Sequence, residues 1–137
     1  MKLFLGFFFV ALCCVPSVEG QRTRSSSLGF DGCYEVTSLS WSPPDDRIKL
    51  VPPRFELTSN NDIHPLPYNP GDVRWGSWKA KDNKLKMNFG LLGGFRGTLK
   101  RSASGEFAGK LKEYCDYRCE WKTRVGSIRI RKVACVR

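Results

Sequence analysis

Apolar and polar residues alternate along most of the chain, and this pattern predicts β-strands rather than helices. In residues 84–90 (KLKMNFG), Leu85, Met87 and Phe89 point to one side and the polar residues between them to the other. Similar stretches are CYEVTSLSW (33–41), IKL (48–50), RFELT (54–58), VRWGSWKA (73–80), FRGTLKR (95–101), GEFAGKLKEYC (105–115), CEWKTRV (119–125) and SIRIRKVAC (127–135). About eight short strands in this spacing predict an all-β fold, an antiparallel barrel of meander-like order.

Turn-forming residues separate the predicted strands. Residues 59–72 (SNNDIHPLPYNPGD) hold three prolines and several turn formers, so we expect an irregular loop there. The glycine-rich stretch FGLLGGFRG (89–97) lacks the glycine-lysine-serine or -threonine end of a phosphate-binding loop, and no helical pattern follows it. We therefore interpret it as a bend between two strands, in which glycine permits positive φ.

The N-terminal twenty residues have the three-part pattern of a secretory signal peptide. Lys2 precedes an apolar run from Leu3 to Val15, and Val18 and Gly20 place small residues before a cut at Gln21. The run is shorter than the roughly 20 residues that a membrane-spanning helix needs. We expect a signal peptide over 1–20, a flexible polar leader over 21–31 and one domain over 32–137, secreted to the extracellular space.

Two of the six cysteines, Cys13 and Cys14, fall within the predicted signal peptide. The others are Cys33, Cys115, Cys119 and Cys135. An even number of cysteines in an exported chain predicts two disulfides. Cys115 with Cys119 and Cys33 with Cys135 is one connectivity, which a closed barrel favours. The alternatives pair Cys33 with Cys115 or with Cys119.

The chain carries a net charge of +10, and the excess lies in its second half. Residues 79–101 hold seven basic residues and one acidic residue, and residues 110–137 hold nine and three. Alternation places many of these cations on the solvent side of their strands. If the strands are neighbours, they form one anion-binding surface, made of Lys84, Lys86, Lys100, Lys110, Lys112, Arg129 and Arg131. A merely solvated outer face is the alternative interpretation.

Residue types that carry catalysis or bind metals are scarce. His64 is the single histidine, and no nucleophile-elbow motif is present. Cysteines in disulfides have no free thiolate, so they can act neither as nucleophiles nor as metal ligands. We therefore expect a protein that is no enzyme, with no metal and no cofactor. Base stacking on the aromatic residues is disfavoured in an exported protein, so nucleic acid is an unlikely partner.

The stretch Gly32-Cys33-Tyr34-Glu35-Val36 resembles the first-strand G-x-W/Y-Y-E-I/V region of lipocalins, a calycin-type family. As in that family, it follows a signal peptide and a polar leader. The resemblance implies an eight-stranded barrel with a ligand cavity. Trp75 and Trp78 fall on opposite strand faces, so one is expected in the core and the other either exposed or at a cavity mouth. The residues expected to line a cavity are Trp75, Met87, Phe89 and Phe107.

The sequence supports three hypotheses of function. The leading one is a monomeric protein that holds a small apolar or amphipathic ligand in the barrel. The second is a cationic protein that binds anionic polysaccharide or the headgroups of a membrane surface, in defence or as an effector. The third, a glycosidase that uses acidic residues alone, has the least support, because no carboxylate pair stands out from the loop acids.

Overall fold

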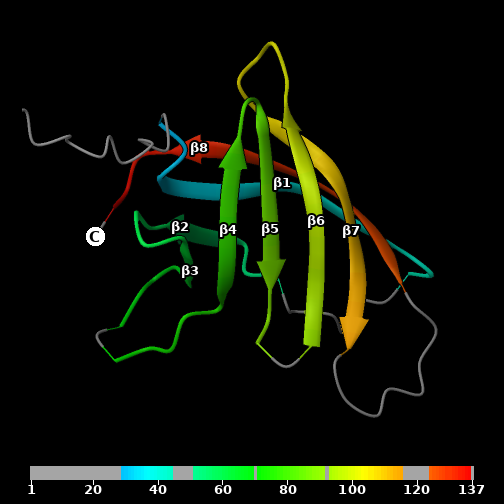
Figure 1. Ribbon diagram of the computed structural model, residues 1–137, viewed down its shortest axis with the longest axis horizontal. Coiled ribbons are helices and arrows are strands. Elements are labelled where there is room, and N and C mark those ends of the chain that lie inside the picture. Colours follow the sequence, from blue (N-terminus) through cyan, green and yellow to red (C-terminus); the bar gives the residue numbers. More distant parts are fainter. Residues whose placement is uncertain (1–28, 45–50, 70, 92, 116–123, 137) are drawn as a thin grey trace, which may run out of the picture.

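The protein folds into a closed β-barrel, seen in a computed structural model that describes residues 29–44, 51–69, 71–91, 93–115 and 124–136 (Figure 1). The strands are β1 (Gly32–Ser42), β2 (Arg54–Leu57), β3 (Asp62–Pro65), β4 (Gly76–Lys81), β5 (Lys84–Phe89), β6 (Gly93–Arg101), β7 (Phe107–Cys115) and β8 (Val125–Val133). Each strand pairs antiparallel with the next one along the chain, and β8 pairs with β1 to close the barrel. The predicted antiparallel meander barrel is confirmed.

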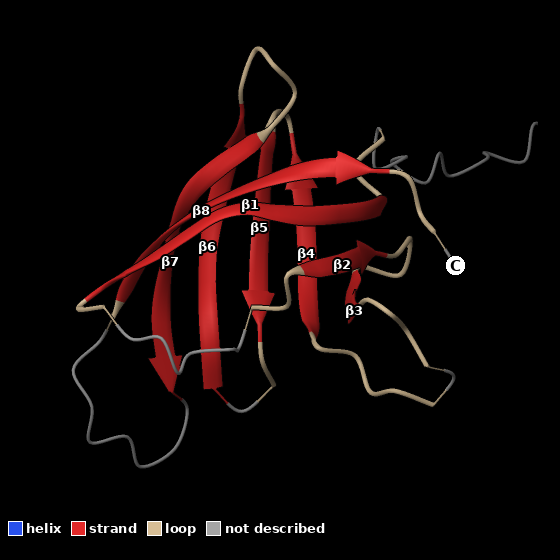
Figure 2. Cartoon of the chain, turned by 180° about the vertical axis from the view of Figure 1, so that it is seen from behind, coloured by secondary structure: helices blue, strands red, loops and turns tan. Residues whose placement is uncertain are grey.

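The long strands β1 and β8 close the barrel on the side opposite β4 and β5. Seen from behind, they run side by side across the molecule (Figure 2). Their register shifts between Val36 and Ser38, a β-bulge that bends β1 as a small barrel requires. The remaining short strands β2 and β3 complete the circle between β1 and β4.

Large apolar side chains fill the interior. The alternation seen in the sequence places Leu85, Met87 and Phe89 inside, where each is at most 2% exposed. Small residues make room for the largest rings: a Cβ on Gly126 would lie 2.4 Å from the Trp41 ring, which packs 4.1 Å from the Phe95 ring centroid. Alternating large and small residues fills an eight-stranded barrel without an internal channel.

The glycine-rich stretch is the turn between β5 and β6, as the bend interpretation predicts. Gly90 has φ of 101°, and a Cβ there would lie 2.0 Å from the carbonyl oxygen of Gly93. No other residue type fits this position without moving the backbone. Leu91, which follows, is 51% exposed.

Two boundaries differ from the sequence prediction. The expected irregular loop over 59–72 contains strand β3, because Ile63 enters the core and pairing with β2 extends to Pro65 at the strand end. At the N-terminal side, Phe30 is buried and packs 5.6 Å from the Phe107 ring, so packing begins within the expected leader. Three predictions lie wholly or mostly outside the described residues: the signal peptide within residues 1–28, the strand over 48–50 and the strand over 119–125.

A disulfide joins Cys33 on β1 to Cys135 beyond the end of β8, with a Cα–Cα distance of 5.2 Å. This bond confirms one of the pairings that the sequence left open. Cys115 is also disulfide-bonded, and Cys119 lies outside the described residues. Disulfides are typical of proteins in oxidising, extracellular-type compartments. In the part of the chain described, no helix is long and apolar enough to span a membrane.

Candidate functional site

Strand register places cations directly opposite one another on the outer side of the barrel. Lys84 of β5 lies between Lys81 of β4 and Lys100 of β6. One step along, Lys79 lies opposite Lys86, and further along Arg96 lies opposite Lys112 of β7. Four cross-strand pairs therefore join like charges, three of them lysine with lysine and one arginine with lysine.

We call this surface the cationic face. It consists of the outward basic residues of β4–β7, namely Lys79, Lys81, Lys84, Lys86, Arg96, Lys100, Lys110 and Lys112. All eight are exposed. The other outward positions on these strands hold glycine, serine, asparagine, threonine, alanine and tyrosine, and none holds an acid. The face is therefore uniformly positive over four adjacent strands.

The seven residues predicted to form one anion-binding surface do not all lie together in the structure. Five of them lie in the cationic face, on β5, β6 and β7: Lys84, Lys86, Lys100, Lys110 and Lys112. Arg129 lies on β8 across from Ala108, two strands away from Lys100.

Arg131 differs from the other six residues because it is paired with an acid. Its Nε donates to Glu35 Oε1 at 3.1 Å, and its Nη2 donates to the same oxygen. These hydrogen bonds raise the pKa of Arg131 above its usual value, and the carboxylate charge adds to the effect. Arg131 therefore belongs to a neutralised pair rather than to the cationic face.

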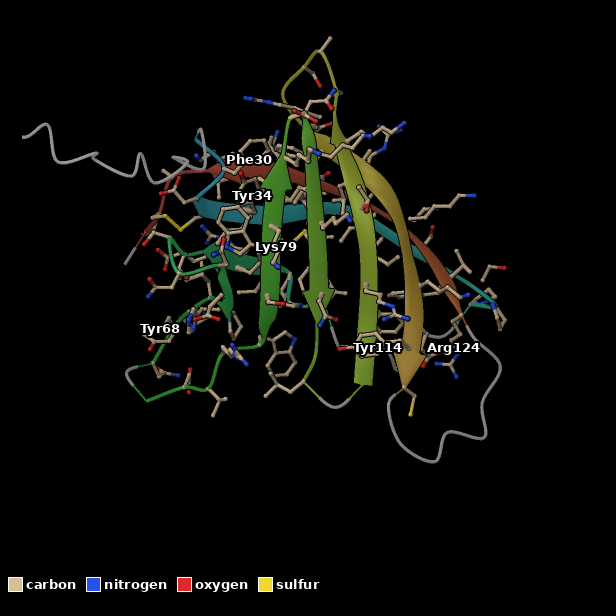
Figure 3. The ribbon with its side chains drawn as sticks, in the orientation of Figure 1. Phe30, Tyr34, Tyr68, Lys79, Tyr114 and Arg124 are labelled. Atoms are coloured by element: carbon tan, nitrogen blue, oxygen red, sulfur yellow. A yellow bond between two sulfur atoms is a disulfide. The ribbon has the colours of Figure 1, made fainter. Side chains whose placement is uncertain are left out.

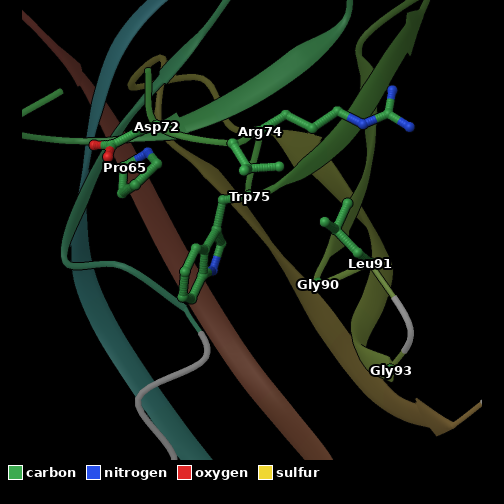
Figure 4. Close-up of a pocket in the computed structure, with 8 residues that line it drawn as sticks. Pro65, Asp72, Arg74, Trp75, Gly90, Leu91 and Gly93 are labelled. Carbon is green, nitrogen blue, oxygen red and sulfur yellow. The ribbon is translucent and has the colours of Figure 1, made fainter. Parts of the chain in front are cut away.

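At one end of the barrel, the β3–β4 loop and the β5–β6 turn enclose a hollow of about 470 Å³. Figure 4 shows Trp75 and Leu91 at its wall. It is lined by Pro65, Asp72, Val73, Arg74, Trp75, Gly90, Leu91 and Gly93. We call this region, with the side chains of Val73, Trp75 and Leu91, the apolar end.

Hydrogen bonds and ring contacts tie the apolar end to the cationic face. The Tyr114 hydroxyl donates to the carbonyl oxygen of Gly90 at 3.2 Å, and the Arg96 guanidinium lies 5.1 Å from the centroid of the Tyr114 ring. Figure 3 shows Tyr114 and Arg124 at this end, and Phe30 and Tyr34 toward the opposite end. Arg96 therefore stands where the two surfaces meet.

The residues predicted to line a ligand cavity lie in two different places. Trp75 lines the hollow at the apolar end and is 37% exposed. Trp78 is its core counterpart, as expected, at 2% exposed. Met87, Phe89 and Phe107 are buried in the packed interior and do not line that hollow.

The single histidine lies on β3 rather than in a loop. His64 is opposite Glu56, and its ring lies edge-on to Tyr68 with centroids 4.9 Å apart. Its Nδ1 is buried and has no hydrogen-bond partner among the described residues. The same described ranges contain no group of three or more His, Cys, Asp or Glu residues that could hold a metal ion.

Sequence reasoning missed several residues of these two surfaces. Lys79 and Lys81 alternate with Trp78 and Ala80, so the period that identified the other lysines already indicated them. At the apolar end the sequence indicated Trp75 but not Val73 or Arg74, because this end forms where two connections distant in sequence meet. Comparison of the chain with protein-family models, with curated proteins and with solved structures finds no match.

Proposed function

We propose that this is an exported, non-enzymatic binding protein whose cationic face binds closely spaced anionic groups, such as those of an acidic polysaccharide or of lipid headgroups. The four directly opposed pairs of cations carry the proposal. Like charges directly opposite one another destabilise a sheet. A bound polyanion removes this repulsion, so the face is better suited to the bound state than to the free one.

The residue types and their spacing fit an extended partner. Neighbouring strands lie about 4.8 Å apart, and outward residues on one strand recur about every 6.7 Å, so the face is a grid of charges. Seven of its eight cations are lysines, which act as mobile point charges rather than as rigid bidentate forks. Such a grid suits repeated anions of variable position, and its binding should weaken as salt screens the charges.

Elution from immobilised heparin in a salt gradient tests the proposal. Lys84→Glu places an acid between Lys81 and Lys100, so we expect about tenfold weaker binding and earlier elution. The matched control is Arg54→Glu on β2, which is also exposed and changes the net charge equally. Equal losses in the two variants would show that net charge alone sets the affinity, and would contradict the proposal.

A second candidate function is the binding of a small apolar ligand, and the hollow at the apolar end favours it. Its volume of about 470 Å³ falls within the roughly 300–1,000 Å³ of small-molecule sites. The ligand would then sit at the mouth of the barrel, beside Trp75, rather than among the packed side chains of the interior. Native mass spectrometry of the protein from its own source tests this: a bound mass is expected, and a consistently unliganded protein contradicts it.

A further inference from the structure

Exposed apolar side chains are concentrated at one end of the barrel. Among the described residues, the large hydrophobics classed as exposed are Tyr68, Val73, Trp75, Leu91, Val125 and Val136. Three of these, Val73, Trp75 and Leu91, line one hollow. Tyr68 instead lines a second hollow, together with Leu66, Pro67 and Val136.

Two turns at the opposite end of the barrel are polar. The β4–β5 turn there consists of Asp82 and Asn83, and the β6–β7 turn spans residues 102–106 (SASGE). In that turn the Ser102 hydroxyl lies 2.8 Å from that of Ser104 and donates to the carbonyl oxygen of Glu106. The β4–β5 and β6–β7 turns thus contrast with the apolar end, although Val136, which follows β8 on their side of the barrel, is also exposed.

Among the described residues, the acidic groups near the apolar end already have partners. Asp62 pairs with Arg74 at 3.4 Å. Glu113 accepts a hydrogen bond from the Arg124 backbone at 3.2 Å, and its carboxylate lies 4.0 Å from the Arg124 guanidinium. The third acid, Asp72, accepts a hydrogen bond from the backbone N–H of Asn69 at 3.0 Å.

Two cations border the apolar end, and neither has an acidic partner among the described residues. Arg96 and Lys112 lie opposite each other, and Arg96 stacks on Tyr114, which is bonded to the turn that carries Leu91. No salt bridge to either cation occurs within the described ranges. Apolar side chains with cations just behind them are the arrangement that an anionic membrane interface favours.

We infer that the apolar end docks on an anionic lipid surface. Val73, Trp75 and Leu91 enter the boundary between headgroups and acyl chains, while Arg96 and Lys112 contact lipid phosphates. This inference rests on the proposed function, because it names the partner of the cationic face. Tryptophan is suited to this depth, since its ring is apolar and its N–H can reach water or headgroups.

Other binding partners would fit the apolar end less well than a lipid surface. A second copy of the chain would bring its own net charge of +10 against the same cations. A small ligand is held by enclosure, yet Val73 is 69% exposed and Leu91 is 51% exposed, so both project from the hollow. A polysaccharide would use the cations and leave these aliphatic groups in water.

Sedimentation of the full disulfide-bonded protein with lipid vesicles tests the inference. Vesicles of phosphatidylcholine mixed with phosphatidylserine should sediment the protein, and vesicles of phosphatidylcholine alone should not. Leu91→Glu should weaken binding by about tenfold, because a carboxylate replaces an inserting side chain. The matched control is Val136→Glu, an equal charge change at an exposed valine outside the apolar end.

The depth to which the apolar end enters the bilayer is measured separately, by quenching of tryptophan fluorescence with lipids brominated on the acyl chain. The native protein should be quenched, and Trp75→Phe should lose most of the quenching while still sedimenting. Quenching that is unchanged in Trp75→Phe, or equal losses of sedimentation in Leu91→Glu and Val136→Glu, would overturn the inference. A dimer in solution that Leu91→Glu dissociates would also overturn it, because a second copy would then cover this end.

Heparin elution separates the two proposals. Leu91→Glu should elute close to the native protein, since a polysaccharide does not use the apolar end. Heparin binding that depends on Lys84, together with no binding to anionic vesicles, leaves the proposed function standing and refutes docking on lipid. If Lys84→Glu and Arg54→Glu elute alike, the cationic face itself is not a binding surface and both proposals fail.

Discussion

The outer side of the barrel has two regions that use the same strand pairing in opposite ways. On the cationic face, lysine meets lysine across three strands in succession, from Lys81 through Lys84 to Lys100. On β8 and β1–β3, which we call the mixed face, acids lie opposite bases: Glu35 lies opposite both Arg54 and Arg131. Both regions belong to one closed sheet with one interior.

This difference shows that the barrel does not require an acid-free surface. Opposite charges across strands stabilise a sheet by roughly 0.2–1 kcal/mol per pair, and like charges destabilise it by similar amounts. The mixed face takes the stabilising arrangement and the cationic face the destabilising one. The fold alone does not call for such a surface, and in the proposed function a bound partner supplies the missing anions.

The largest effect on stability should come from the disulfide beside the mixed face. Cys33→Ala with Cys135→Ala opens a loop with a sequence separation of 102 residues, and we expect a loss of about 4–5 kcal/mol in the free energy of unfolding. Urea denaturation measures this loss. Heparin affinity, measured where the variant is folded, should stay at the native value because the bond lies away from the cationic face. Affinity that falls as far as in Lys84→Glu would contradict the separation of the two regions.

The interior beneath both faces should respond to alkaline pH. Tyr34 is fully buried, and its desolvation raises its pKa from 10.0 to about 12, partly offset by the charge of Arg101. Between these values the unfolded chain has lost this proton and the folded chain has kept it. The contribution of Tyr34 to stability is therefore complete below about pH 10 and is lost as the pH rises toward 12.

Tyr34→Phe tests this assignment. The variant removes the hydroxyl that donates to the Phe30 carbonyl oxygen at 2.7 Å, so we expect a loss of about 1 kcal/mol at neutral pH. Tyr34→Phe should also lose less stability between about pH 10 and 12 than the native protein does. The exposed control Tyr68→Phe should lose as much stability over this range as the native protein. Urea denaturation at several pH values measures both; an alkaline loss equal in all three proteins would contradict the assignment.

The fold and half of the candidate site were readable from the sequence, for a local reason. Period-two alternation is a property of neighbouring residues, so it identified β5 and the outward direction of its lysines. Pairings between distant residues leave no such trace: Arg131 was predicted with the free cations, but its partner Glu35 lies 96 positions away. Strand β3 was missed because proline-rich composition outweighed the single core residue Ile63.

The smallest expected effects on stability come from single charge removals, and they should have opposite signs on the two faces. Lys84→Gln removes repulsion from Lys81 and Lys100, so we expect stability to rise by about 0.5 kcal/mol at low salt. Glu35→Gln removes an exposed ion pair with Arg131, so stability should fall by a similar or smaller amount. Thermal denaturation at low and high salt measures both, and added salt should shrink both differences.

The Lys84→Gln result bears most directly on function. A variant that is more stable than the native protein and yet elutes earlier from heparin would show that this lysine lowers stability and raises affinity at once. Stability exchanged for activity in this way is typical of binding and catalytic residues. If Lys84→Gln instead loses stability as Glu35→Gln does, the lysines are held by favourable contacts within the barrel. The fold itself would then account for the cationic face, and no anionic partner would be needed to explain it.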